Sequence, residues 1–144
     1  MRYLLAAALL LVVAPAQKPA KQFLNPEGLP KPTGYTHVVV SRAGRMVFIS
    51  GQGGSAEGRM PPDFASQARN TFENIGRCLK AAGAGLNDIV KVNYYVTDMA
   101  NTAELRKIRA GYLNQAATPA STLVQVGLGQ GMLLEVEAVA IVTE

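Results

Sequence analysis

The most informative segment of this chain is Leu133-Leu134-Glu135-Val136-Glu137-Ala138-Val139-Ala140-Ile141-Val142, which has the pattern of a long β-strand. Successive side chains of a strand point to opposite faces of its sheet. One face here is wholly apolar, as expected where helices pack. The other face carries Glu135 and Glu137 between apolar neighbours. We therefore predict a sheet with one open face that other copies of the chain cover.

A second segment, Ile89–Val96, repeats this alternation. Lys91, Asn93 and Tyr95 fall on one face, and apolar residues with Tyr94 fall on the other. Two strands that share this design are expected to lie in the same sheet, with their polar residues on the same open face. Polar groups enclosed between subunits on that face would be suited to form a site.

The best-marked helix begins after Pro61-Pro62, with Asp63 as the predicted N-cap, and ends before Gly83. Apolar side chains recur at helical spacing along it, at Phe64, Ala68, Phe72, Ile75, Leu79 and Ala82. Cys78 lies at the margin of this stripe. We expect it to be a packed thiol and not a reactive one.

The remaining elements complete the order ββαβαββ. Val38–Ser41 and residues 46–50 are predicted to form a hairpin that turns at Gly44. A second helix is expected over residues 101–113, followed by a strand over residues 122–126. This order in one short domain predicts an α+β fold, with one mixed sheet and both helices on one face.

The chain begins like a secretory signal peptide. Arg2 precedes an apolar run that closes on Ala14-Pro15-Ala16, the small residues that a signal peptidase recognises. The run is too short to favour a transmembrane anchor. We predict cleavage after Ala16, a single domain over residues 17–144, a periplasmic or secreted protein, and no stable membrane anchor after cleavage.

Composition excludes several classes of protein. The 144 residues are 49% hydrophobic, as for a globular domain, and contain one Cys and one His, which disfavours a disulfide scaffold or a metal site. The formal charge of +4 falls to +3 if Arg2 is removed, because 14 basic residues become 13 against 10 acidic ones. This small excess gives no reason to expect nucleic-acid binding.

Candidate chemistry is sparse. The run Gly51-Gln52-Gly53-Gly54 does not lead directly into a helix, so we reject a nucleotide-binding loop. His37 is expected to make a hydrogen bond at a strand edge. The pair Glu135 and Glu137 is the stronger candidate, because apolar surroundings raise a carboxyl pKa towards the range useful for acid–base catalysis. Pairing of these carboxylates with Lys91 or an arginine across strands is the alternative.

From Asn25 to Val142 the chain resembles the Rid family of reactive intermediate deaminases, also called the YjgF family. The matching stretches, in order, are Gly34-Tyr35, Ile49-Ser50-Gly51-Gln52, Gln67-Ala68 through Asn74 to Ala81-Ala82-Gly83, Asp88-Ile89-Val90-Lys91, Thr97-Asp98-Met99, Pro119-Ala120, Val124-Gln125-Val126 and Glu135-Val136-Glu137-Ala138-Val139-Ala140. The resemblance implies a chorismate-mutase-like α+β fold. It also implies a homotrimer whose three sheets line a central barrel, with small-molecule pockets between subunits.

The resemblance also implies a reaction. In active members these pockets hydrolyse enamines and imines, such as 2-iminobutanoate and 2-iminopropanoate, to the keto acid and ammonia without a metal or organic cofactor. Tyr35, Ser50 and Gly51 match positions of the pocket wall. Glu135 matches the glutamate that handles protons.

This chain departs from the family pattern at the substrate's carboxylate. Ser121 stands in Pro119-Ala120-Ser121-Thr122 where active members have arginine, and Arg106 stands where they commonly have asparagine. A serine has neither the charge nor the bidentate fork of a guanidinium, so the usual hydrolysis is expected to be weak or absent. Ser121, Thr122 and Arg106 remain predicted substrate-binding residues.

Two accounts of this departure compete. In the first, Arg106 or Arg109 grips an anionic keto or imino acid from the other wall of the cleft. In the second, the chemistry is lost and the trimer persists as a non-catalytic ligand-binding or chaperone-like interaction protein. An alternative for Arg106 is a solvated helix face shared with Lys107 and Arg109.

Overall fold

A four-stranded mixed sheet forms the centre of the protein in the computed structural model, which describes residues 19–129 and 131–143. The predicted leader, residues 1–16, lies outside the described residues. The strand order is β3-β6-β4-β5, and only the β4–β5 pair is parallel. The strands are β3 (Arg45–Gly53), β6 (Leu134–Val142), β4 (Ile89–Val96) and β5 (Ala120–Gln125).

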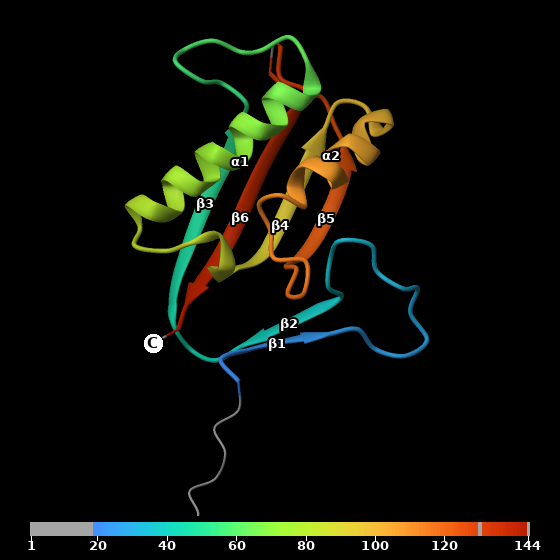
Figure 1. Ribbon diagram of the computed structural model, residues 1–144, viewed down its shortest axis with the longest axis vertical. Coiled ribbons are helices and arrows are strands. Elements are labelled where there is room, and N and C mark those ends of the chain that lie inside the picture. Colours follow the sequence, from blue (N-terminus) through green and yellow to red (C-terminus); the bar gives the residue numbers. More distant parts are fainter. Residues whose placement is uncertain (1–18, 130, 144) are drawn as a thin grey trace, which may run out of the picture.

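Two helices, α1 (Phe64–Ala81) and α2 (Thr102–Arg109), cover one face of this sheet (Figure 1). The predicted N-cap of α1 is confirmed, because the Asp63 carboxylate accepts a 2.8 Å hydrogen bond from the Ser66 N–H. Short 3₁₀ helices, η1 (Leu86–Asp88) and η2 (Met99–Asn101), precede β4 and α2. No helix in the described ranges is long and apolar enough to cross a membrane.

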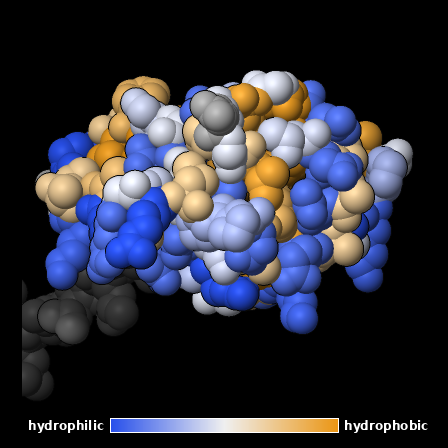
Figure 2. Space-filling view, turned by 90° about the horizontal axis from the view of Figure 1, so that it is seen from above, coloured by the Kyte–Doolittle hydropathy of each residue, from blue (hydrophilic) through white to orange (hydrophobic). Residues whose placement is uncertain are grey.

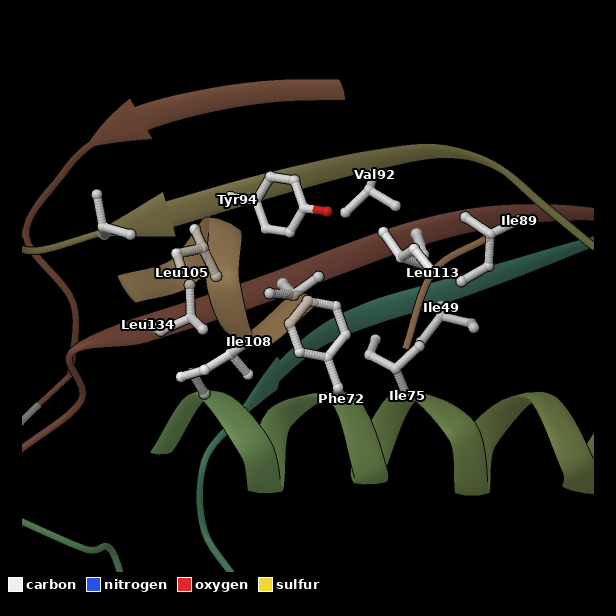
Figure 3. Close-up of a cluster of buried hydrophobic side chains, with 14 of the residues drawn as sticks. Ile49, Phe72, Ile75, Ile89, Val92, Tyr94, Leu105, Ile108, Leu113 and Leu134 are labelled. Carbon is white, nitrogen blue, oxygen red and sulfur yellow. The ribbon is translucent and has the colours of Figure 1, made fainter. Parts of the chain in front are cut away.

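The hydrophobic core lies between α1 and the sheet. Phe72 and Ile75 project from α1 towards Val92 and Tyr94 of β4 (Figure 3). The predicted alternation of β6 is confirmed, since Leu134, Val136, Ala138 and Ala140 are each 4% exposed or less. Cys78 is a free thiol that packs against this core, as expected.

The predicted hairpin between Val38–Ser41 and residues 46–50 is wrong. Strand β2 (Val38–Ser41) instead pairs with β1 (Lys21–Leu24), which the sequence analysis missed, in a separate two-stranded sheet. Strand β3 pairs with β6 from Arg45 onwards. Just before that point, Gly44 lies so close to the Val142 carbonyl that a Cβ would not fit. The chain therefore passes beside the end of β6 and does not reverse into a hairpin, and the expected single sheet becomes two.

The second helix is shorter than the predicted 101–113. Helix α2 ends at Arg109, and a tighter turn follows in which the Gly111 N–H donates to the Ile108 carbonyl at 3.0 Å. Leu113 nevertheless reaches the core and is 5% exposed. The helical spacing therefore predicted the buried residue correctly while overestimating the length of the helix.

Gln67 of α1 connects two loops that are distant in the sequence. Its side chain is fully buried, and its Nε2 donates to the carbonyls of Pro61 and Gly131 at 2.7 Å each. Its Oε1 accepts from the Leu133 N–H at 2.8 Å. The loop before α1 and the loop before β6 are thus tied to the same side chain.

The face of the sheet opposite the helices carries large exposed apolar side chains. Phe48 is 71% exposed and Met46 is 55% exposed, and both lie on the edge strand β3. Val124 is exposed on β5, at the other edge. In the view from above, hydrophobic residues (orange) lie mostly in the upper part of the picture, and hydrophilic residues (blue) predominate along its lower edge (Figure 2).

Candidate functional site

A bulge in β3 brings three predicted site residues together. Ile49 pairs with Ala138 and Gln52 pairs with Val136, so Ser50 and Gly51 both stand opposite Glu137. Gly51 lies directly against the Glu135 carboxylate, where a Cβ would overlap the carboxylate oxygen. Any side chain at position 51 would displace the Glu135 carboxylate, so the bulge brings Ser50, Gly51 and Glu135 together.

The two carboxylates of β6 differ in their partners. Glu137 accepts 2.6 Å hydrogen bonds from the Tyr95 hydroxyl and from the Asn93 amide. The bond from Tyr95, then that from Asn93, and the charge of Lys91 hold the pKa of Glu137 below its usual value. The expected rise in pKa is therefore wrong for Glu137, because both donors favour its ionised form.

Glu135, in contrast, has no hydrogen-bond or ion-pair partner in the part of the chain that the structure describes. The alternative expectation, an ion pair between Lys91 and one of these carboxylates, is not met within the described residues. The Lys91 ammonium instead donates a hydrogen bond to the Thr122 hydroxyl at 2.7 Å. Burial lowers the pKa of Lys91, and the charge of Glu137 opposes this. Of the two carboxylates, Glu135 is thus the one that no other described residue holds by a hydrogen bond or an ion pair.

A depression of about 300 Å³ lies on the open face next to these groups. Its lining combines apolar and polar side chains, namely Phe48, Ile49, Ser50, Lys91, Asn93, Glu137, Ala138 and Val139. Thr122 belongs to this side as well, because it pairs with Asn93 across β4 and β5 and contacts Lys91. The Thr122 side chain therefore faces the opposite side of the sheet from that of Ser121, since neighbouring strand residues face opposite sides. Its role in substrate binding stays a prediction.

A second cavity, of about 130 Å³, brings together the other predicted residues Tyr35, Arg106 and Ser121. It lies between α2 and β5 and is completed by Thr33, Thr102, Leu105, Arg109 and Leu123. Ser121 reaches it because it pairs with Val92, whose side chain is buried on the helix side of the sheet.

Arg109 is a functional candidate whose burial could have been predicted from the helical spacing of α2. It follows Leu105 by four residues and Ile108 by one, so it belongs to the buried face of α2. The expectation of a solvated face holds for Arg106 and Lys107, which are exposed, and is wrong for Arg109, which is 6% exposed.

The Arg109 guanidinium is held from two sides. Its Nη2 donates to the Thr33 carbonyl at 3.1 Å, and its Cζ lies 5.3 Å from the centre of the Tyr94 ring. Burial raises the pKa of the Tyr94 hydroxyl, and the charge of Arg109 opposes that shift. Arg109 thus has a fixed position at the edge of the cavity.

The single histidine has a structural role. His37 Nε2 lies 2.9 Å from the Pro30 carbonyl oxygen, so the expected hydrogen bond is present. The His37 and Tyr35 rings form a T-shaped pair with their centres 5.2 Å apart. Within residues 19–129 and 131–143, no group of three or more His, Cys, Asp and Glu side chains could hold a metal ion.

Comparison with known proteins identifies the family. A profile of the endoribonuclease L-PSP family matches residues 29–142. The 2-iminobutanoate/2-iminopropanoate deaminase of Mus musculus is 34% identical over 101 residues, which cover 67% of this chain and 74% of that protein. The chain belongs to the Rid family. The crystal structure of RidA from an Antarctic Psychrobacter matches with a TM-score of 0.66 and 33% identity, covering 84% of this chain and 99% of that one.

This Rid-family chain is also similar to a RutC family protein of Pyrococcus horikoshii. The two are 36% identical over 129 residues, which cover 83% of this chain and 97% of that protein. The family and the α+β fold expected from the sequence are confirmed. The roles of individual site residues remain predictions.

Proposed function

We propose that this Rid-family protein hydrolyses small enamines or imines to a carbonyl compound and ammonia, with Glu135 handling the protons. The observation that carries this proposal is the Glu135 carboxylate, which has no hydrogen-bond or ion-pair partner within residues 19–129 and 131–143 and lies against Gly51 in the β3 bulge. Glu137 is less suited to proton transfer, because two hydrogen bonds stabilise its anion. Relatives that include a 2-iminobutanoate/2-iminopropanoate deaminase support the reaction class.

The reaction needs only water and one group that exchanges a proton. Glu135 accepts a proton from water as the water oxygen adds to the imine carbon, and it passes that proton to the nitrogen, which gives a neutral carbinolamine. Glu135 then accepts the hydroxyl proton of the carbinolamine and passes it to the nitrogen. The C–N bond breaks as the carbonyl group forms, and ammonia leaves. The balance is one imine and one water consumed for one carbonyl compound and one ammonia formed, with Glu135 regenerated.

We propose further that the working site is shared between copies of the chain in a homotrimer. Glu135 and the bulge lie on the β3–β6 side of the sheet, and Tyr35, Arg106 and Ser121 lie beside β5, with β4 between them. A threefold arrangement with the open faces towards a central barrel would cover Phe48 and Met46. The same arrangement would bring the β3 edge of one copy to the β5 side of the next.

Residues 1–16 are proposed to be a leader removed on export, which places the mature protein in the periplasm or outside the cell. Amino-terminal sequencing of protein recovered from those fractions is expected to begin at Gln17. Recovery of the protein only from the cytoplasm with Met1 retained would contradict export.

Ammonia release from freshly generated 2-iminopropanoate tests the activity. Glu135→Gln keeps the shape of the side chain and removes its proton chemistry, so kcat/KM is expected to fall by about 10² to 10⁴. Glu137→Gln is the matched control, two residues further along the same strand face, and is expected to cost less than about tenfold. Activity that survives Glu135→Gln, or protein that never accelerates ammonia release, would overturn the proposal and favour a non-catalytic binding role.

A further inference from the structure

The cavity between α2 and β5 contains positive charge without a counter-ion. Its lining holds two guanidinium groups, Arg106 and Arg109, and no Asp or Glu. The ion pairs found within the described residues are Lys21–Asp88 and Arg77–Glu73, and both lie elsewhere. The remaining polar groups of the lining are hydroxyls, from Thr33, Tyr35, Thr102 and Ser121.

A buried guanidinium is normally paired with an anion, because removing its charge from water is costly. Arg109 is 6% exposed, and among the described residues its guanidinium donates to the Thr33 carbonyl and lies over the Tyr94 ring. A carbonyl and an aromatic face are partial negative charges only. An anion held in the cavity would supply the missing full charge.

The space fits a small organic anion. The cavity measures about 130 Å³, whereas a cavity of roughly 150 Å³ accommodates benzene. A neighbouring cavity of about 240 Å³ shares Thr33, Arg106 and Arg109 and adds Gly34 and Gln115. The two arginines therefore line two adjoining spaces, which together are larger than a carboxylate group alone.

We propose that Arg106 and Arg109 bind the carboxylate of a 2-imino or 2-keto acid in this cavity. Planar guanidinium forks match carboxylate geometry, and the hydroxyls of Tyr35 and Ser121 are additional donors. This inference rests on the proposed function and names its substrate class. The small Ser121 side chain leaves the cavity open for the two cations of α2, where an arginine would add a third like charge.

Binding of pyruvate, the stable product of 2-iminopropanoate hydrolysis, tests the site without requiring turnover. Pyruvate is titrated into the full-length oligomer by calorimetry, at low salt and in 0.5 M NaCl. Arg106→Ala is expected to weaken binding at least tenfold, and Arg106→Lys by less, because the charge is kept while the fork is lost. High salt is expected to weaken wild-type binding, as for any ion pair that solvent reaches.

Lys107→Ala is the matched control, because Lys107 is an exposed cation on the same helix that lines neither cavity. It is expected to bind pyruvate within twofold of wild type. Equal losses in Lys107→Ala and Arg106→Ala would show a general charge effect and overturn the proposal. Inorganic phosphate that bound more tightly than pyruvate would overturn the carboxylate class.

Arg109→Gln is a second variant, accompanied by a thermal unfolding curve, because Arg109 is part of the packed face of α2. A folded Arg109→Gln protein that binds pyruvate as well as wild type would contradict its part in the site. Pyruvate binding that depends on Arg106, in a protein that releases no ammonia, would sink the proposed hydrolysis and leave this inference standing. Hydrolysis that is unaffected by Arg106→Ala would overturn this inference and leave the proposed hydrolysis standing.

Ser121→Arg distinguishes relocation of the cation from its loss. If the cations have moved to α2, Ser121→Arg alone gains no pyruvate affinity, while Ser121→Arg in the Arg106→Ala background recovers at least tenfold. A large gain from Ser121→Arg alone would show that the cavity lacks a working cation and would overturn the proposal.

Discussion

The two sides of the sheet carry complementary halves of one chemistry. On the β3–β6 side, Glu135 lies beside the bulge with no partner in the described part of the chain, and no arginine lines the adjacent depression. On the β5 side, Arg106 and Arg109 line a cavity that contains no carboxylate. A single chain keeps its proton acceptor apart from its cations. The comparison supports the proposal that a second copy of the chain completes the site.

The largest effect is expected from filling the seat of Glu135. Gly51→Ala places a methyl group where the Glu135 carboxylate lies, so hydrolysis is expected to fall by about 10² as the carboxylate is displaced. The measurement is kcat/KM for ammonia release. Gly76→Ala is the control, since a Cβ there meets nothing within 4 Å, and it should keep full activity and stabilise α1 by about 0.5–1 kcal/mol. Full activity in Gly51→Ala would contradict the role of Glu135 in the reaction.

A mixing experiment tests whether the two halves meet between copies. Glu135→Gln and Arg106→Ala proteins are denatured and refolded together at equal concentration. A shared site is intact when its glutamate comes from one parent and its arginine from the other, which has a probability of one half times one half. We therefore expect about one quarter of wild-type activity from two weakly active parents. No recovery, in a mixture shown to contain hybrids, would place both residues in sites formed within one copy.

The smallest effect concerns the contrast between the two carboxylates. The folded-state pKa of Glu137 is lowered, so its contribution to stability is present above the unfolded value, about 4.3, and is lost as the pH falls through the folded pKa. Glu137→Gln is expected to lower Tm by roughly 2 °C near pH 7. The difference from wild type should disappear well below pH 4. A difference that grew in acid would reverse the assigned sign.

The sequence predicted what depends on periodicity. Alternation along β6 identified the core residues, and the stripe of α1 identified its buried face. Strand pairing was not predictable in this way, because β1 has only four residues and two of them, Lys21 and Gln22, are polar. Nor does alternation reveal that β6 lies between β3 and β4, since each strand has one apolar face whatever its neighbours are.

The candidate site divides in the same manner. Resemblance to the Rid family supplied Ser50, Gly51 and Glu135, but the bulge that joins them depends on register across two strands distant in the sequence. The lowered pKa of Glu137 depends on hydrogen bonds from Asn93 and Tyr95 of β4, and the pattern of one strand does not reveal such partners. The burial of Arg109 could have been predicted from the helical period, because Arg109 shares the buried face of α2 with Leu105 and Ile108.

The side chain of Gln67 has a consequence for motion. Its three bonds, to the carbonyls of Pro61 and Gly131 and from the Leu133 amide, all break if that one side chain leaves its place. The loops before α1 and β6 should therefore open as one cooperative unit and not independently. In hydrogen exchange, the Leu133 amide of a Gln67→Ala protein would lose its protection while the amides at the centre of α1 keep theirs.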